Sequence, residues 1–387
     1  MIPTRLLRRV SNNVRNQSTV TERIQVQPEE PIQTFRTIES DPAKHNRDHL
    51  NRFYTVPVNV KNRIFPFTGV PRRFNDHCKT FAETCILVRE PAIELISYLQ
   101  QTDYTRPVNR YVIYGPLGSG KTLTLMHLMH YGFNMKHLIV HVPWIPDWFR
   151  RRSESAPSER VEGLFNLPIV GAFWLAHFKH QNGPLLAQLD IRLQKDYIWN
   201  PREQNPAGTP LVDMIDFGIA RGKYACDVID GVLNEIKLSS TAGICKTLVL
   251  LDGFNALFAE DSIIKDSEFK RLYANRVSLT HSFLNFTKYD WCNGAIVALV
   301  DILAVKKENQ FESSMYPRYL LGKEGFEHLD PFLPIEVPFY TQDEFDAVIE
   351  YYKNRLWLRN LTESGKRELE ILTQRSPYKL MRYTAPL

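Results

Sequence analysis

The sequence predicts an α/β fold in which a parallel sheet is flanked by helices, with an extended arm before it and a small helical lid after it. Two observations predict the sheet. The first is a short run of β-branched and aromatic residues, 111–114, followed by a glycine-rich turn and a helical pattern up to Tyr131. The second is an apolar run, 247–251, that ends in Asp252. This second pattern is typical of a buried parallel strand that delivers a carboxylate to the sheet edge.

The glycine-rich turn fits the phosphate-loop pattern G-x-x-x-x-G-K-[ST]. In this pattern glycines let successive backbone N–H groups curl around a phosphate, and the helix that follows points its positive end at the same anion. A chance match in a loop is the alternative, but the position between a strand and a helix favours a P-loop NTPase. The candidate nucleotide-binding residues are Gly115, Gly118, Ser119, Gly120, Lys121 and Thr122.

A magnesium site is predicted from two of these segments. In P-loop NTPases the loop threonine and a carboxylate at the end of a second strand hold the metal, which here predicts Thr122 and Asp252. Many such ATPases carry an acidic residue directly after that aspartate to orient the attacking water, whereas this chain has Gly253. Fast hydrolysis is therefore not expected unless Asn255 or Glu260 substitutes.

The base of the nucleotide is not identified by a motif. Residues 287–290, Thr-Lys-Tyr-Asp, match the guanine-specificity pattern [NT]KxD. That motif should follow a strand, but here it ends a helical pattern, so we interpret the match as coincidental.

Composition limits the class of protein. A chain of 387 residues with 43% hydrophobic content can form one large domain with attachments. No apolar run approaches 18 residues, so we expect no membrane span. The five cysteines are scattered and odd in number, which favours a reducing compartment without a disulfide framework or a zinc site.

The first 20 residues have the composition of a mitochondrial transit peptide. They contain four arginines and no acidic residue, together with serine, asparagine and a small apolar face around Leu6, Leu7 and Val10. A disordered basic tail is the alternative interpretation.

Positive charge is concentrated in two flanks of the chain. Residues 44–79 hold eight Lys or Arg against two Asp, and residues 351–387 hold eight against three Glu. The region between them, 80–350, has 26 basic and 33 acidic residues. Basic flanks interleaved with aromatic residues suit a phosphate backbone or an acidic protein surface. A solvated surface is the alternative for either flank.

The remaining elements are predicted in chain order. Residues 21–79 are rich in proline and predict an extended basic arm that needs a partner, residues 80–338 the NTPase core, and residues 339–387 the lid. Within these regions we expect helices over 80–101 with an interruption near Pro91, 185–199, two within 210–238, 271–289, 342–357, 362–373 and 377–382, and strands over 137–142, 293–301 and 332–337. Asp301 would then lie where an AAA-like sheet carries its phosphate-sensing residue.

The chain as a whole resembles the death-associated protein three family, the nucleotide-binding proteins of the mitochondrial small ribosomal subunit. The segments that carry the resemblance are KTFAETCILVREPAIELISYL, RYVIYGPLGSGKTLTLMHLMH, YIWN, LDGFNALF, DWCNGAIVALV and LLGKEGFEHLDPFLPIEV, and it extends from about Tyr54 to the C-terminus.

The resemblance implies an AAA-like core that binds GTP, or GDP or ATP, with Mg²⁺. It also implies a place in the mitochondrial matrix, with mitochondrial ribosomal proteins and small-subunit rRNA as partners, near the head of the subunit and its contact with the large subunit. Some members are associated with apoptosis.

Two hypotheses follow for this chain. One is a structural ribosomal component with bound nucleotide as a folding ligand, favoured by Gly253, the long basic arm and the absence of a clear arginine finger. The other is an active NTPase or GTP-dependent switch that acts in ribosome assembly or apoptosis signalling.

Overall fold

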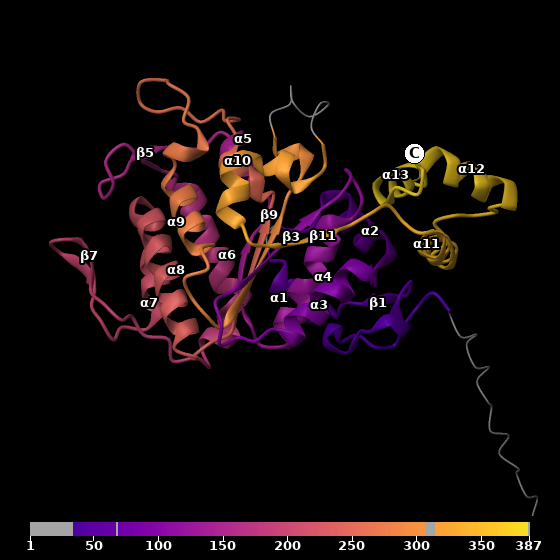
Figure 1. The fold of residues 1–387 in the computed structure, drawn as a ribbon, viewed down its shortest axis with the longest axis horizontal. Coiled ribbons are helices and arrows are strands. Elements are labelled where there is room, and N and C mark those ends of the chain that lie inside the picture. Colours follow the sequence, from indigo (N-terminus) through magenta and orange to yellow (C-terminus); the bar gives the residue numbers. More distant parts are fainter. Residues whose placement is uncertain (1–33, 67–68, 306–313, 386–387) are drawn as a thin grey trace, which may run out of the picture. The chain divides into compact units, whose positions relative to one another are not determined.

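The computed structural model describes residues 34–66, 69–305 and 314–385 (Figure 1). The chain divides into a short unit, residues 1–34, and a unit from Phe35 to Leu387 that holds almost all of the described residues. The predicted transit peptide and the first part of the predicted arm lie outside the described residues. Within the described ranges, no helix has both the length and the apolar character needed to cross a membrane.

A five-stranded parallel sheet forms the centre of the second unit. Its strands are β3 (Asn109–Tyr114), β4 (Leu138–Val142), β9 (Thr247–Asp252), β10 (Gly294–Leu299) and β11 (Leu333–Glu336), in the spatial order β11-β3-β10-β9-β4. Every neighbouring pair is parallel. The predicted α/β class and parallel sheet are therefore confirmed. Strands β4, β9 and β10 are buried along their whole length and almost continuously apolar because helices cover both faces of the sheet, whereas the edge strand β11 is mostly exposed.

Alternate residues of each strand enter two separate cores. Val112, Val249 and Ile296 pack into one core, and their neighbours Ile113 and Leu250 pack into the other. This follows from the period of two along a strand. Figure 1 shows the larger helical layer, α6 to α9, on one side of the sheet and α1, α3 and α4 on the other.

The helices of these layers correspond partly to the predicted ones. The bounds are α1 (Val58–Ile64), α3 (Glu90–Gln101), α4 (Lys121–Asn134), α5 (Asp147–Arg150), α6 (Pro168–Leu186), α7 (Leu211–Ala220), α8 (Ala225–Thr241), α9 (Ser278–Phe286) and α10 (Pro317–Leu329). The helix predicted over 185–199 is wrong, because α6 ends at Leu186 and the later residues enter a hairpin of β7 (Tyr197–Asn200) and β8 (Glu203–Asn205). A second small hairpin joins β5 (Ala156–Pro157) to β6 (Phe165–Asn166).

The segment expected to be an extended arm has ordered elements over its described part. It contains two 3-10 helices (Pro42–Lys44 and Arg47–His49), strand β1 (Phe53–Thr55), α1 and most of α2 (Arg72–Phe81). Strand β1 pairs antiparallel with β2 (Cys85–Leu87), so the helix predicted over 80–101 is interrupted by a strand, and α3 begins at Glu90 with Pro91 in its first turn. Apolar residues such as Tyr54 and Ile64 are fully buried in the core on the α4 side of the sheet.

The lid consists of three helices, α11 (Gln342–Asn354), α12 (Glu363–Thr373) and α13 (Pro377–Tyr383), as predicted from the sequence. Each helix begins at a side-chain cap, from Thr341, Thr362 and Ser376 respectively. A third apolar cluster joins α11 and α13 to α2, β1 and β2. The two basic flanks of the sequence therefore meet, and the Arg73 guanidinium of α2 lies 5.8 Å from the ring centre of Tyr378 on α13.

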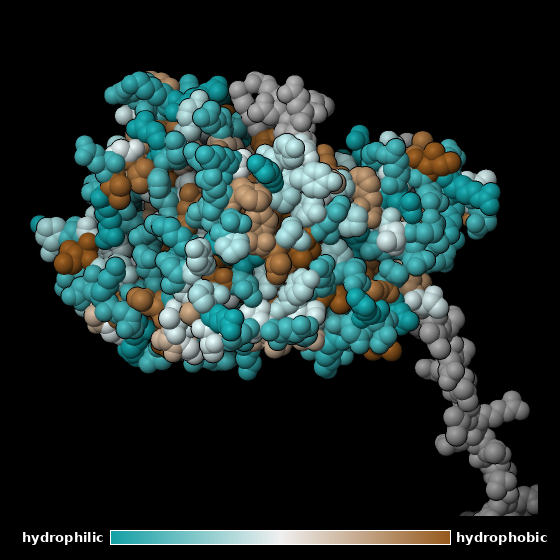
Figure 2. All heavy atoms as spheres, viewed as in Figure 1, coloured by the Kyte–Doolittle hydropathy of each residue, from teal (hydrophilic) through white to brown (hydrophobic). Residues whose placement is uncertain are grey.

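The face of this unit that Figure 2 shows is mostly hydrophilic, with scattered small apolar patches. One such patch lies over the lid, where α12 exposes Ile371 and Leu372. Single exposed apolar residues are common on monomeric proteins and carry no conclusion here.

Candidate functional site

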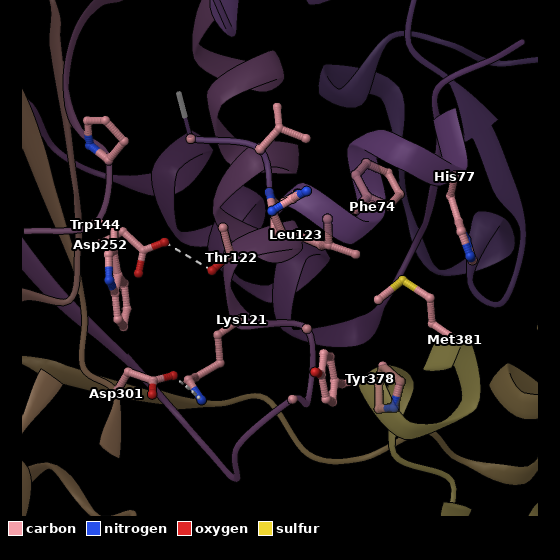
Figure 3. Close-up of a pocket in the computed structure, with 18 of the residues that line it drawn as sticks. Phe74, His77, Lys121, Thr122, Leu123, Trp144, Asp252, Asp301, Tyr378 and Met381 are labelled. Atoms are coloured by element: carbon pink, nitrogen blue, oxygen red, sulfur yellow. Dashed lines mark hydrogen bonds and ion pairs between the residues drawn. The ribbon is translucent and has the colours of Figure 1, made fainter. Parts of the chain in front are cut away.

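The carboxyl ends of three neighbouring strands converge at one edge of the sheet. Leu299 of β10 is in register with Ile113 of β3 on one side and with Asp252 of β9 on the other. The glycine-rich loop that leaves β3 therefore lies beside the last residue of β9, although 130 residues separate Thr122 from Asp252. The Thr122 hydroxyl donates a hydrogen bond of 3.0 Å to Oδ2 of Asp252 (Figure 3).

The loop has the backbone that its glycines allow. Gly118 has φ of +78°, and a Cβ there would lie 2.6 Å from the Cβ of Tyr378. At Gly115, with φ of +146°, a Cβ would lie 2.3 Å from the carbonyl oxygen of Val337. Side chains are excluded at both positions by sterics and by conformation. Gly120 precedes the first residue of α4, so the free N–H groups of that helix start at the loop.

Lys121 is held by three acceptors of the protein. Its ammonium donates to the carbonyl oxygens of Gly115 and Pro116, at 3.0 Å each, and lies 2.9 Å from Oδ2 of Asp301. The lysine side chain is 3% exposed, so this is a buried ion pair. An ammonium group has three N–H donors, so a phosphate that binds Lys121 must replace at least one of these contacts. Asp301 therefore contacts the loop lysine directly at the position where a phosphate sensor was expected.

Asp252 is a buried carboxylate with unused coordination capacity. Burial raises its pKa to about 7, the Thr122 hydrogen bond opposes that rise, and the nearby Asp301 charge adds to it. Its Oδ1 atom is buried and has no hydrogen-bond partner among the described residues. A buried carboxylate oxygen beside a threonine hydroxyl is the kind of ligand pair that a hard cation such as Mg²⁺ prefers. The residues present therefore fit the predicted magnesium site.

The residue after Asp252 is glycine for a steric reason. Gly253 has φ of +74°, and a Cβ there would lie 2.7 Å from Cδ of Pro146 and 3.3 Å from Cε3 of Trp144. Trp144 itself has φ of +46°, which is uncommon for a bulky residue. The segment after β4 thus packs against the position where many P-loop ATPases carry an acidic side chain, and a glutamate cannot be placed there without moving that segment.

The two substitutes for that acidic residue do not face the loop. Asn255 is buried, its amide nitrogen donates to the backbone oxygen of Asp301 at 3.0 Å, and its amide oxygen accepts from the backbone nitrogen of Asp301 at 3.1 Å. Its amide therefore orders the end of β10. Glu260 is exposed and does not line the cavity described below.

Two contacts join the lid to the glycine-rich loop. The backbone N–H of Tyr378 donates to the carbonyl oxygen of Gly118 at 3.1 Å. Arg89, which precedes α3, donates to the carbonyl oxygen of Ser119 at 2.7 Å and forms a bidentate pair with Glu344 of α11 at 2.8 and 3.0 Å. The sequence offers no signal for Arg89, because its partner Glu344 lies 255 residues away.

A cavity of about 860 Å³ extends from the loop to the lid. Gly118 to Thr122, Asp252 and Asp301 line one part of it, residues of α2, β2, α11 and α13 line a second, and residues of the segment after β4, α5 and α6 line a third. Figure 3 shows Lys121, Thr122 and both aspartates on one side, with Phe74, His77 and Met381 across the cavity. The volume lies in the range of small-molecule and cofactor sites.

Residues 287–290, which match the guanine pattern, are absent from the lining of this cavity. The hydroxyl of Thr287 lies 2.8 Å from Nε2 of His328, and the carboxylate of Asp290 pairs with Lys237 at 2.7 Å. The polar side chains of Thr287 and Asp290 are therefore bonded to other protein residues and are not directed at a nucleotide base.

Comparison with known proteins matches most of the chain to one family of mitochondrial ribosomal proteins. The family model of mitochondrial ribosomal death-associated protein 3 matches residues 86–383. The small ribosomal subunit protein mS29 of Mus musculus is 36% identical over 370 residues, which cover 95% of this chain and 93% of that protein. The mS29 protein of Bos taurus is 37% identical over 366 residues, with 94% and 91% covered.

A solved structure of the Aeropyrum pernix ORC2 protein, in its ADP form, is 15% identical. The match covers 79% of this chain and 64% of that chain, with a TM-score of 0.34. A score this low supports no conclusion about fold or ligand.

Proposed function

This chain belongs to the mitochondrial ribosomal death-associated protein 3 family, and we propose that it binds GTP with Mg²⁺ as a ligand that stabilises its fold within the small ribosomal subunit. It is a structural component of the mitochondrial small ribosomal subunit and resides in the mitochondrial matrix, among the proteins and rRNA of that subunit.

One observation carries the binding part of the proposal. The glycine-rich loop, the start of α4, Thr122 and the unpaired oxygen of Asp252 meet at one edge of the sheet. Loop N–H groups and Lys121 would hold the phosphates. Thr122 and Asp252 would hold the metal, whose charge offsets that of the phosphates when bound. The identity of the base, guanine rather than adenine, is proposed from the family resemblance.

Retention of the nucleotide without rapid turnover is supported by the packing around Gly253. No carboxylate follows Asp252, Asn255 is engaged with the backbone of Asp301, and Asp301 is paired with Lys121. Neither Gly253 nor the engaged amide of Asn255 can accept a proton from an attacking water, and Asp301 becomes available only if a phosphate displaces it from Lys121. A ligand bound to the native state alone at 100 times its dissociation constant adds about 2.7 kcal/mol of stability.

The test is the identity of the nucleotide in the native particle. The small subunit would be isolated with magnesium present throughout, and its nucleotide extracted and identified chromatographically. Intact GTP in one-to-one amount is the expected result. Lys121→Ala should abolish retention and lower the melting temperature, whereas Lys323→Ala, which removes an 85% exposed lysine on α10, should change neither. Unchanged nucleotide content and melting in Lys121→Ala would contradict the proposal.

The alternative, a nucleotide-dependent switch, is favoured by one observation. The lid contacts the loop through Tyr378 and Gly118, and Arg89 links Ser119 to Glu344. A change in the loop would therefore reach the lid directly. Robust GTP turnover by the purified protein, lost in Lys121→Ala, would establish this alternative in place of the structural ligand.

A further inference from the structure

The part of the cavity that faces away from the glycine-rich loop is lined mainly by apolar side chains. We call it the apolar lobe. It is formed by α2, β2, α11 and α13, with Phe74, Leu87, Val348 and Met381 among its lining residues. Because it is continuous with the loop region, a ligand anchored at the loop by its phosphates would extend into it.

Two polar side chains in this lobe have no hydrogen-bond partner. His77 on α2 is 9% exposed and Tyr352 on α11 is 7% exposed, and both line the cavity. Their rings lie 5.8 Å apart in an edge-on arrangement. Neither imidazole nor hydroxyl makes a hydrogen bond to any of the described residues, and the contacts of His77 are with the aromatic rings of Tyr352, Trp357 and Phe81.

Neither polar group is closed off from solvent, because both side chains line the cavity. A polar group that a ligand covers needs a hydrogen-bond partner on that ligand. Two adjacent polar side chains without protein partners on the wall of one cavity are therefore positioned to bind a ligand with complementary donors and acceptors.

The chemistry of the pair indicates which part of a ligand it faces. Burial lowers the pKa of His77 and raises the pKa of Tyr352, so both side chains are neutral at physiological pH. A neutral imidazole offers one donor and one acceptor, and a phenol offers a donor and an acceptor. A phosphate presents acceptors and negative charge, so the N–H groups of the loop and the Lys121 ammonium match it better than this neutral pair does. The edge of a purine base presents both donors and acceptors, and its faces pack well against aromatic and thioether side chains such as Phe74 and Met381.

We propose that His77 and Tyr352 recognise the edge of the purine base of the bound nucleotide, with the base seated in the apolar lobe. This inference rests on the proposed nucleotide function and adds the residues that read the base. His77 and Tyr352 are thereby assigned to base specificity, which the short motifs of the sequence do not encode.

The test separates the base from the phosphates. Binding of GTP, ATP and inorganic tripolyphosphate, each with magnesium, would be measured by titration calorimetry on the full-length protein. His77→Phe keeps an aromatic ring against Trp357, and Tyr352→Phe removes one oxygen that has no partner. We expect each variant to bind the preferred nucleotide about tenfold more weakly, as for the loss of one hydrogen bond. Tripolyphosphate binding should be unchanged, and the difference in affinity between GTP and ATP should shrink.

Tyr54→Phe is a matched control. The hydroxyl of Tyr54 is buried and has no partner among the described residues, and Tyr54 does not line the cavity. This variant should bind all three ligands like the unaltered protein. Melting temperatures would be measured for every variant, and Tyr352→Phe is expected to keep its melting temperature because no hydrogen bond is lost.

Three outcomes would overturn the assignment. Equal nucleotide affinity and equal GTP-to-ATP ratio in both variants would mean that the pair does not read the base. Equal loss of tripolyphosphate and nucleotide binding would mean that the residues only support the site. If the unaltered protein binds tripolyphosphate but gains nothing from a base, this inference fails and phosphate binding stands; if it binds none of the ligands, the proposed function itself fails.

Discussion

The buried ion pair between Arg89 and Glu344 allows a quantitative prediction about the lid. Their side chains are 8% and 5% exposed, and the two hydrogen bonds between them measure 2.8 and 3.0 Å. Glu344 also accepts from the backbone N–H of Thr341 at 2.9 Å, which completes the capping box of α11. The substitution Glu344→Ala would remove both interactions at once.

The expected magnitude follows from these contacts. Removal of one partner of a buried pair costs about 3–5 kcal/mol, because the remaining charge stays buried. The Thr341 cap itself remains, but the lost hydrogen bond from the Thr341 N–H to the Glu344 carboxylate costs about 1 kcal/mol more. Arg89 keeps its bonds to the carbonyl oxygens of Ser119 and Pro338, which places the first cost at the lower end of its range. We therefore expect Glu344→Ala to reduce the free energy of unfolding by about 4 kcal/mol, a large part of a typical total of about 5–15 kcal/mol.

Urea unfolding at equilibrium, followed by circular dichroism, would measure this loss. Glu327→Ala is the control, because its contact with Lys323 is an exposed pair at 4.0 Å and should contribute almost nothing. The double substitution Arg89→Met with Glu344→Met should recover most of the stability, since no unpaired charge then remains. A loss below about 1 kcal/mol in Glu344→Ala would refute the reasoning from burial, and so would a double variant as unstable as the single one.

Three further predictions concern other parts of the chain. Gly253→Ala should lower stability by about 1–3 kcal/mol, measured by urea unfolding, because its φ is +74° and its Cβ would meet Pro146; an unchanged midpoint would contradict this. Acid should destabilise the protein below about pH 6.5, because burial lowers the pKa of His127 well below 6.5 and that of His130 to about 4. The folded state holds both histidines neutral, so the free energy of unfolding is constant above pH 6.5 and falls between pH 6.5 and pH 4 as the unfolded chain takes up protons. The shift at His130 alone accounts for a loss of about 3 kcal/mol over that window. A free energy of unfolding that does not change over this window, or a pH profile that is the same in His130→Gln, would count against the prediction. Deletion of residues 1–20 should abolish import into isolated mitochondria and leave nucleotide binding intact; a truncated protein that still enters the matrix would exclude the transit peptide.

The fold shows how much of the positive charge of the two basic flanks is available to a partner. Helix α2 from the first flank, and the end of α11 with α13 from the second, share one apolar cluster, so parts of the two flanks lie together beside the cavity. Part of their charge is paired within the chain, since Arg355 of the second flank pairs with Glu83 and Arg47 of the first flank pairs with Glu90. Counts of charge along the sequence therefore overstate the charge available to a ribosomal partner.

Local patterns in the sequence were sufficient for the central elements of the fold. The strand, glycine turn and helix of the loop, the apolar strand ending in Asp252 and the capped helices of the lid are each encoded by consecutive residues. Their physical causes, side-chain period, backbone freedom of glycine and hydrogen bonds of the caps, act over a few residues. The parallel sheet then brought Thr122 and Asp252 together as expected, because parallel strands end at one edge.

Only the tertiary structure decided how the site is completed. It paired Arg89 with Glu344 and Lys121 with Asp301. It also placed His77 and Tyr352 on the wall of one cavity, where their polar groups have no hydrogen-bond partner among the described residues. It also showed that the glycine after Asp252 is required by Pro146, and that residues 85–87 form a strand within a segment of helical pattern. Each of these depends on contacts between residues far apart in the chain, where the energy comes from burial and charge pairing and leaves no trace in local spacing.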